Sequence, residues 1–185
     1  MSAPIQVLVI VGSLRRASLN RQAALAAERL KPEGMTLEFA DLSAIPPYNQ
    51  DVQDQGSPEP VQTLCAQLAR ADAVLFVSPE YNYSMPGVLK NAIDWASRDP
   101  AQPFKGKAAA IMGASPGMLG TARMQYHLRQ TLVFLDAHPL NRPEVMIAQA
   151  NKKFDAAGNL TDETTTKLIR GLLEALADWV RQLKR

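Results

Sequence analysis

Residues 5–20 read IQVLVIVGSLRRASLN, and the two halves of this segment predict different structures. Residues 5–11 are almost all apolar and often β-branched, which is typical of a strand buried on both faces. Gly12 and Ser13 break that pattern, and residues 19–30 have the apolar spacing of a helix. A buried strand that passes through a short polar loop into a helix is the repeating unit of an α/β domain with a parallel sheet.

The same alternation continues through the rest of the chain. Four further strands are predicted, the last of them weak because Pro143 interrupts it: residues 36–40, 73–78, 107–113 and a segment within 139–147. Helices are predicted in the other segments: residues 60–70, a helix that begins at Pro86, residues 119–135 and a long last helix that Thr161 caps. Its buried face is expected to carry Leu168, Leu172, Leu176, Trp179 and Leu183. The proline-rich residues 43–60 are predicted to form a loop.

These elements predict the α/β fold class and a single flavodoxin-like domain over residues 1–185. Strands that are apolar throughout and alternate with helices form a parallel sheet with helices on both faces. Five such strands fit a doubly wound sheet of order 2-1-3-4-5. Ligands of these sheets bind beyond the carboxyl ends of the strands, at the switch point between strands 1 and 3. We therefore expect the function to lie in the loops after Val11, Ser78 and Gly113.

The composition excludes several classes of protein. The net charge is only +2 and the basic residues are dispersed, so neither nucleic acid nor a membrane surface is an expected partner. Without a secretory signal or an apolar run of about 20 residues, the chain is expected to be cytoplasmic and not inserted in a membrane. Its single cysteine, Cys65, is predicted to be a core residue. His127 and His138 have structural roles in this interpretation, and no metal site is predicted.

The first loop, residues 12–20, leaves a buried strand and enters a helix, where free backbone N–H groups and the helix dipole attract an anion. Ser13, Ser18 and Asn20 add neutral donors, and Arg15 or Arg16 adds positive charge, so the loop suits a phosphomonoester. The alternative is a helix that Ser18 caps beside exposed arginines. The motifs G-x-x-x-x-G-K-[ST] and G-x-G-x-x-G are both absent, which argues against a P-loop ATPase and a dinucleotide-binding Rossmann domain.

The second and third loops complete the predicted site. Residues 79–87 place two tyrosines, an asparagine and a carboxylate after strand 3, where aromatic rings and backbone N–H groups suit a flat heterocycle. Surface tyrosines on an ordinary turn are the alternative. Residues 113–121 contain three glycines, which permit the backbone to approach a ligand closely, although an ordinary loop explains them equally well. All three loops are expected at one edge of the sheet.

With these loops in place, the chain resembles the NADPH-dependent FMN reductase family, and within it the bacterial quinone and chromate reductases. Four segments carry the resemblance: GSLRxxSxN at 12–20, PEYNYSxPGxLKNAIDW at 79–95, QYHLR at 125–129 and LTD at 160–162. The second segment is long and highly specific. The resemblance implies non-covalent FMN, with NADPH or NADH as the co-substrate.

The resemblance also implies where FMN binds. The phosphate is expected at the first loop, the isoalloxazine against the second, and the third nearby, which gives the set Ser13, Arg15, Ser18, Leu19, Asn20, Pro79, Glu80, Tyr81, Asn82, Tyr83, Ser115 and Gly117. Pro116 removes one possible N–H donor from the third loop. No catalytic acid or base is predicted, because the flavin carries the chemistry. Glu80 is expected to turn toward backbone N–H groups, and the N–H groups of residues 80–82 to stabilise negative charge on the ring.

The implied reaction is a ping-pong sequence of two hydride transfers, from the nicotinamide to FMN and from FMN to an acceptor. Quinones are the expected acceptors, with azo compounds, chromate or free flavin as further ones. The family implies a homodimer or homotetramer, in which a polar contact is expected from Arg123, Tyr126, Glu144 and Tyr83.

Two other functions stay open on sequence grounds. A flavodoxin-like carrier shuttles single electrons without a nicotinamide, but such carriers are generally strongly acidic. The net charge of +2 suits anionic partners such as NADPH better. A structural or regulatory protein without cofactor would purify colourless and take up no FMN.

Overall fold

The structure is a computed structural model that describes residues 4–184. Its sheet is parallel throughout and has the order β2-β1-β3-β4-β5, with β6 paired to β4. The strands are β1 (Ile5–Val11), β2 (Met35–Phe39), β3 (Ala73–Val77), β4 (Ala108–Ala114), β5 (His138–Pro139) and β6 (Val145–Ile147). The predicted fold class and strand order are confirmed.

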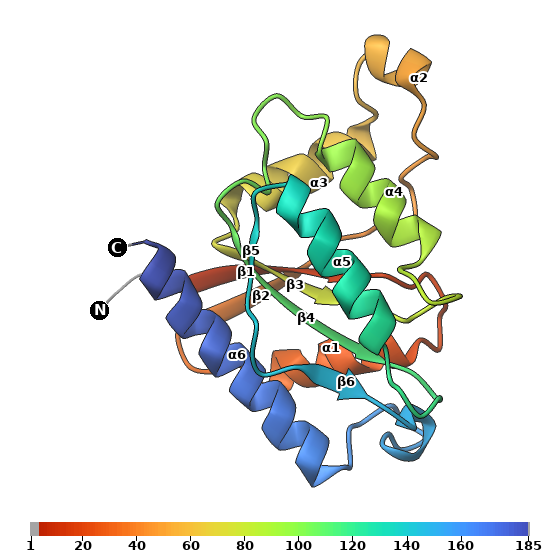
Figure 1. The fold of residues 1–185 in the computed structure, drawn as a ribbon, viewed down its shortest axis with the longest axis vertical. Coiled ribbons are helices and arrows are strands. Elements are labelled where there is room, and N and C mark those ends of the chain that lie inside the picture. Colours follow the sequence, from red (N-terminus) through yellow and green to blue (C-terminus); the bar gives the residue numbers. More distant parts are fainter. Residues whose placement is uncertain (1–3, 185) are drawn as a thin grey trace.

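Helices cover both faces of the sheet, as Figure 1 shows. They are α1 (Leu19–Leu30), α2 (Gln50–Asp54), α3 (Glu59–Arg70), α4 (Gly87–Ala96), α5 (Ala122–Phe134) and α6 (Glu163–Leu183), with a 3₁₀ turn at Ala150–Lys152. One core cluster joins the sheet to α1 and α6, and a second joins it to α3, α4 and α5. The buried strands β3 and β4 contribute alternate residues to the two clusters, which explains their unbroken apolar sequences.

The expected single fifth strand is wrong. The segment 139–147 is divided between β5, which pairs with the start of β4, and β6, which pairs with its end. Proline has no N–H to donate to a sheet ladder, and Pro139 and Pro143 both fall in this segment. The chain therefore leaves the ladder between the two short strands and rejoins it at Val145.

Several helix boundaries also differ from the prediction. The expected loop 43–60 contains α2, which projects from the body in Figure 1 and begins after Asn49, whose side chain accepts from the N–H of Asp51 at 2.9 Å. Pro86 precedes α4 instead of opening it, and α5 begins three residues later than predicted. Asp162, not Thr161, caps α6, because its carboxylate accepts from the N–H of Thr165 at 2.8 Å.

The buried face of α6 is rotated from the predicted one. Leu172 and Leu176 are buried as expected, whereas Leu168 and Leu183 are 40% and 37% exposed. The face that packs on β4 and α1 instead adds Thr165, Ile169, Leu173, Ala177 and Val180. Trp179 is partly buried, and its indole N–H donates to the carbonyl of His138 at 2.8 Å.

Cys65 lies in the core on α3, as its spacing predicted. Burial raises the pKa of its thiol to about 12, because the thiolate loses its hydration, and Asp99 acts in the same direction. The thiol is therefore protonated at neutral pH and is not a reactive nucleophile.

Among residues 4–184, none of the helices combines the length and the apolar character that crossing a bilayer requires.

Candidate cofactor-binding site

The three loops leave the sheet side by side. In the register of the ladder Val11 faces Val77, and Val77 faces Met112, so β1, β3 and β4 end at the same edge. Glycine is required at two of the positions where a strand passes into its loop, Gly12 and Gly113. A Cβ on Gly12 would overlap the side chain of Ser78, and one on Gly113 would overlap Thr121 and the carbonyl of Ser78.

A hollow of about 330 Å³ lies between the first loop and the start of the second. It contains nine of the predicted site residues, together with Ala114 and Pro116: Ser13, Arg15, Ser18, Leu19, Asn20, Pro79, Glu80, Tyr81 and Ser115. A second hollow of about 450 Å³ is lined by Glu80, Asn82, Tyr83, Ser115, Gly117, Met118, Leu119, Gly120 and Arg123. The two hollows share Glu80 and Ser115, so they adjoin, and every predicted site residue lines one of them.

Six lining residues lie outside the predicted set: Ala114, Pro116, Met118, Leu119, Gly120 and Arg123. Pro116 and Gly120 belong to the third loop, which was considered from the sequence, and Arg123 was expected only at a contact between chains. Ala114 is small and carried no chemical signal, and Met118 and Leu119 were passed over as ordinary loop residues. Both are largely exposed, at 74% and 58%. A signal for them was present in the sequence. Met118 and Leu119 are large apolar residues between two glycines in a loop at the edge of the sheet where ligands bind, and such residues indicate a binding surface.

Hydrogen-bond donors gather at the N-terminus of α1. Leu19 and Asn20 are its first two residues, so their N–H groups have no acceptor within the helix. The hydroxyl of Ser18 accepts from the N–H of Arg21 at 3.3 Å, and that of Ser13 from the N–H of Arg15 at 3.4 Å. A hydroxyl that accepts can still donate its own proton, so the capping role of Ser18 is compatible with binding an anion. Together with the Arg15 guanidinium, this donor set suits a phosphate.

Asn20 connects the first loop to the third. Its side chain is 3% exposed, and it both donates to the carbonyl of Ala114 at 2.9 Å and accepts from its N–H at 2.8 Å. The Asn20 side chain thus gives a hydrogen-bond partner to both backbone groups of Ala114, the last residue of β4. The backbone N–H of Asn20 then remains to donate to a phosphate.

The second loop contains a tight turn. Tyr81 and Ser84 exchange two backbone hydrogen bonds of 3.0 Å, and the residues between them, Asn82 and Tyr83, have φ angles of 49° and 70°. Two consecutive left-handed residues within such a pair form a type I′ turn. Because the N–H of Tyr81 donates within the turn, it is not available to the flavin ring, which corrects that part of the expectation. The N–H groups of Glu80 and Asn82 remain for this role.

Glu80 fixes the second loop to α5. Its carboxylate accepts from the backbone N–H groups of Arg123 and Met124, at 3.0 and 3.2 Å, and pairs with the guanidinium of Arg123. The side chain is only 5% exposed. The expectation that Glu80 turns toward backbone N–H groups is confirmed. Because this carboxylate already accepts from two N–H groups at the start of α5 and pairs with an arginine, its oxygens are turned toward α5.

The residues expected to join two chains form pairs within one chain. The guanidinium of Arg123 lies over the ring of Tyr83, 3.6 Å from its centroid, and the hydroxyl of Tyr126 donates to Glu144 at 2.7 Å. Their contact with a second chain stays a prediction.

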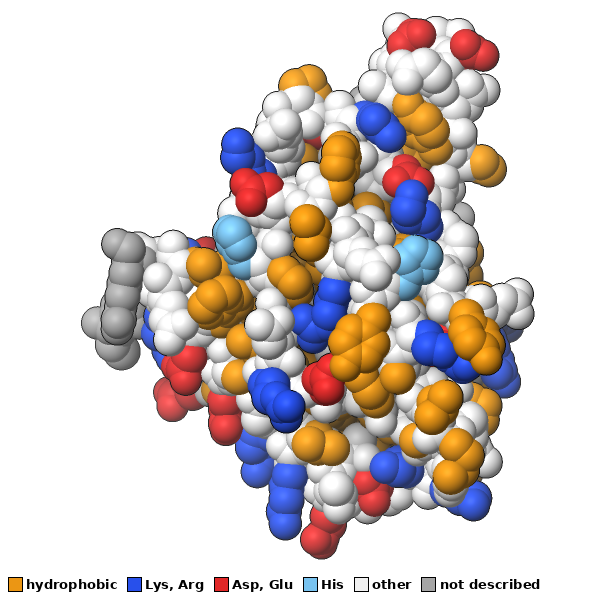
Figure 2. Space-filling model, in the orientation of Figure 1, with side chains coloured by type: hydrophobic (Ala, Val, Ile, Leu, Met, Phe, Trp, Pro, Cys, Tyr) orange, Lys and Arg blue, Asp and Glu red, His pale blue; other side chains and the backbone are white. Residues whose placement is uncertain are grey.

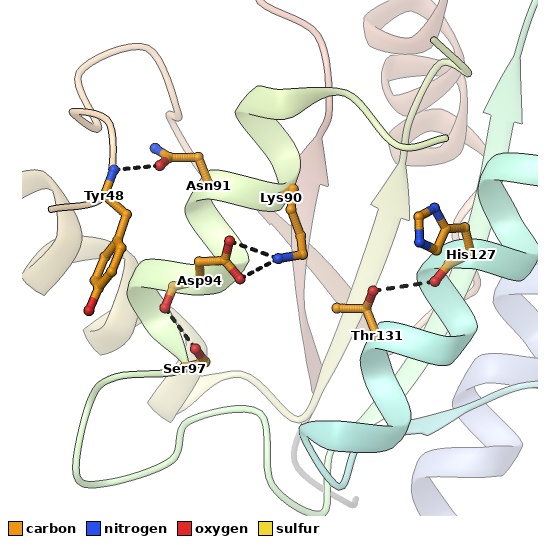
Figure 3. A network of polar contacts seen from close by, with 7 residues as sticks. All are labelled: Tyr48, Lys90, Asn91, Asp94, Ser97, His127 and Thr131. Atoms are coloured by element: carbon orange, nitrogen blue, oxygen red, sulfur yellow. Dashed lines mark hydrogen bonds and ion pairs between the residues drawn. The ribbon is translucent and has the colours of Figure 1, made fainter. Parts of the chain in front are cut away.

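Polar side-chain contacts surround α4 and α5, the two helices next to the second loop. Figure 3 shows Asn91 of α4 accepting from the N–H of Tyr48, and Lys90 paired with Asp94 along the same helix. His127, on the facing helix α5, has its Nδ1 2.7 Å from the hydroxyl of Ser84. This contact holds the end of the turn against α5, and the structural role expected for His127 stays a prediction.

The doubly wound sheet, with free N–H donors at the start of α1 and tyrosines at the switch point, is that of a flavodoxin-like protein. Residues 5–152 match the family model of NADPH-dependent FMN reductases. The chain is 60% identical to an NAD(P)H-dependent FMN reductase of Pseudomonas aeruginosa and 43% identical to a quinone reductase of Escherichia coli, over the full length of each. The solved structure of FerB, a flavoenzyme NAD(P)H:(acceptor) oxidoreductase from Paracoccus denitrificans, superimposes with a TM-score of 0.88 at 37% identity, over 96% of this chain and 98% of FerB.

The chain belongs to the NADPH-dependent FMN reductase family. It is therefore an oxidoreductase whose cofactors are FMN and NAD(P)H. The residues present fit FMN, because the donors around α1 suit a phosphate and lie in a hollow that adjoins a second one lined by Tyr83 and Met118. A ligand with a phosphate at one end and a flat ring at the other matches this arrangement.

Proposed function

We propose that this protein transfers hydride from NAD(P)H through FMN to quinones by a ping-pong mechanism. The observation that carries the proposal is the pair of adjoining hollows, one with the donors of a phosphate site and the other open beside the second loop. FMN, when bound, supplies the chemistry of accepting a hydride and passing it on. Nicotinamide and acceptor must both reach the isoalloxazine, which we place in the second hollow, so they approach it from the open side of that hollow in turn.

The protein contributes binding and orientation. The hydroxyls of Ser13 and Ser18, the guanidinium of Arg15 and the N–H groups at the start of α1 hold the phosphate. Residues 79–83 lie along the isoalloxazine, with Ser115 and Gly117 at its edge. The N–H groups of Glu80 and Asn82 stabilise negative charge on the ring. Among the described residues that line the two hollows, Glu80 is the one carboxylate, and because it is held by α5 we assign it no role as acid or base.

The acceptors proposed are quinones, and azo compounds, chromate and free flavin are further ones that the same opening admits. Two relatives support the quinones: the Escherichia coli protein, and a protein of Burkholderia sp. named 2-hydroxy-1,4-benzoquinone reductase that is 44% identical over 96% of this chain. Either NADPH or NADH is the proposed donor, and the proposed location of the enzyme is the cytoplasm.

We further propose a homodimer or homotetramer. Figure 2 shows hydrophobic side chains distributed over the face that α5 occupies, and Tyr126, Val133 and Phe134 of that helix are exposed. Exposed apolar side chains along one helix favour a protein partner. Light scattering tests the idea: an unchanged mass in both Arg123→Ala and Glu144→Ala would show that these residues do not hold an assembly together.

The function is tested by anaerobic stopped-flow absorbance of FMN-loaded protein mixed first with NADPH and then with benzoquinone. We expect rapid loss of the visible flavin band and then its full return, because each substrate exchanges one hydride with FMN. If the band survives NADPH but bleaches with a one-electron donor, the chain is a single-electron carrier and the reductase proposal is wrong.

A further inference from the structure

Gln125 is a buried polar residue that lines neither hollow. It opens the segment QYHLR at 125–129, one of those that carry the family resemblance, and lies in the first turn of α5 with 1% of its surface exposed. Its Nε2 donates twice, to the hydroxyl of Thr121 at 3.1 Å and to the carbonyl of Val145 at 2.9 Å. Among residues 4–184, its Oε1 finds no hydrogen-bond partner. The amide is thus oriented by the two groups to which it donates, at the cost of a buried acceptor left unpaired.

The two acceptors of Gln125 belong to different elements at the edge of the sheet where ligands bind. Thr121 precedes α5, is buried, and lies so close to Gly113 of β4 that a Cβ on this glycine would overlap it. The same Cβ would overlap the carbonyl of Ser78, which follows β3. Val145 is the first residue of β6. Gln125 therefore joins the start of α5 to β6 and to the strand ends from which the second and third loops leave.

The start of α5 in turn holds the second loop. The N–H groups of Arg123 and Met124, immediately before Gln125, donate to the carboxylate of Glu80 at 3.0 and 3.2 Å. Glu80 and Asn82 are the residues whose own N–H groups we assign to the flavin ring. Because a hydrogen bond weakens as its donor moves or tilts away, the position of α5 decides how well these two N–H groups stabilise negative charge on the ring.

We propose that Gln125 is a positioning residue for FMN: it fixes the start of α5, which holds Glu80, and so aims the N–H groups of the second loop at the ring. The inference rests on the FMN site of the proposed function. The ring gains electrons when FMN is reduced, so the aim of these N–H groups affects the binding of reduced FMN more than that of oxidised FMN. Loss of the Gln125 contacts is expected to weaken the binding of reduced FMN selectively and thereby to lower the midpoint potential of the bound cofactor.

The test is a redox titration of bound FMN against an indicator dye, without nicotinamide or acceptor. The difference in midpoint potential from free FMN gives the ratio of the Kd for reduced FMN to the Kd for oxidised FMN. Gln125→Met keeps a long, unbranched side chain and removes both donors. We expect this ratio to rise about tenfold, which lowers the potential by about 30 mV for a two-electron couple.

A second pair of variants changes the acceptor instead of the donor. Thr121→Val keeps the shape of a buried side chain that lines neither hollow, and removes the hydroxyl to which Gln125 donates. It is expected to lower the potential less than Gln125→Met does, because the contact with Val145 remains. Thr121→Ser keeps the hydroxyl and is expected to match the potential of wild type.

A matched control is Asn91→Leu in α4. The Asn91 amide also makes two hydrogen bonds to backbone groups, one with the N–H of Tyr48 (Figure 3) and one with the carbonyl of Pro46, and it lines neither hollow. Asn91→Leu and Gln125→Met are both expected to lower Tm, since each leaves backbone groups without a partner. Asn91→Leu is expected to leave the ratio of the two Kd values within about twofold of wild type.

A lower Tm with an unchanged potential in Gln125→Met would show an ordinary structural role and overturn the inference, as would an equal shift of potential in Asn91→Leu. If Gln125→Met takes up no FMN, the two Thr121 variants decide, and equal potentials in Thr121→Val and Thr121→Ser would overturn it. Failure of NADPH to bleach the wild type would reject the proposed reductase function instead, and it leaves the dye titration unaffected.

Discussion

The first and second loops lie at the same edge of the sheet, but they obey local sequence rules to different degrees. The first loop is conventional: Ser18 caps α1, and the N–H groups that remain free are those that any helix start leaves. In the second, a tyrosine occupies a glycine position, and the loop is held by contacts to α5, more than 40 residues away in sequence. The helix-start donors of the first loop thus follow from local chemistry, although Asn20 also binds Ala114 at the end of β4, whereas the backbone of the second loop is held by tertiary contacts to α5.

The strongest test of this contrast is a variant of the residue that connects the first loop to the third. Asn20→Ala leaves the buried N–H and carbonyl of Ala114 without their partner, and is expected to destabilise the protein by about 3 kcal/mol. Urea unfolding measures the change. A loss below about 1 kcal/mol would show that the two loops are positioned independently of each other.

Glu80→Gln tests the dependence of the second loop on α5. The amide cannot neutralise Arg123 and accepts less strongly from the two N–H groups, so a loss of about 2 kcal/mol in unfolding free energy is expected. The control is Glu38→Gln at the solvent-exposed pair with Arg70, where less than about 0.5 kcal/mol is expected. Equal losses of unfolding free energy in Glu80→Gln and Glu38→Gln would contradict the claim that α5 holds the second loop.

Arg15→Ala tests the charge at the first loop. Loss of one charge-assisted hydrogen bond to a phosphate is expected to weaken FMN binding about tenfold, measured by fluorescence titration of the FMN-free protein. The neighbouring Arg16 lines neither hollow, so Arg16→Ala is the matched control and should bind FMN like wild type. If the two variants weaken binding equally, the effect comes from general charge and not from a positioned arginine.

Asp162→Ala tests a helix cap that lines neither hollow. Hydrogen bonds from the Thr165 hydroxyl and N–H hold the pKa of the Asp162 carboxyl below its ordinary 3.8. A lowered pKa in the folded state stabilises the protein above the unfolded pKa, and this contribution disappears as the pH falls through the folded value. The variant should lose about 1 kcal/mol at pH 7, less at pH 3, and no FMN affinity. A pH-independent loss in urea unfolding would contradict the assigned ionisation.

The sequence was sufficient wherever the determining pattern was local. Apolar strands alternating with helices predicted a parallel sheet, and their number matched a doubly wound fold of the observed order. The loops after the strands, together with the family resemblance, predicted twelve residues that all line the two hollows. The sequence-based prediction was wrong about the last strand, which a proline divides, and about the cap of α6, which is Asp162. Both features depend on which backbone N–H and C=O groups form hydrogen bonds in the folded chain.

The long-range contacts had no sequence signal at all. Asn20 and Ala114 are 94 residues apart, and Glu80 meets Arg123 across 43. Asn82 favours a left-handed backbone, but the turn was not recognised because Tyr83 occupies the second position, where such turns usually carry glycine.

The central claim is that the two hollows together hold one FMN molecule, and a crystal structure of the protein with FMN tests it most directly. We predict the phosphate against Arg15 and the first N–H groups of α1, and the isoalloxazine along residues 79–83 with one face toward Tyr83 and Met118. FMN bound elsewhere, such as the separate hollow between Arg98 and Phe134, or with its phosphate away from α1, would contradict the account.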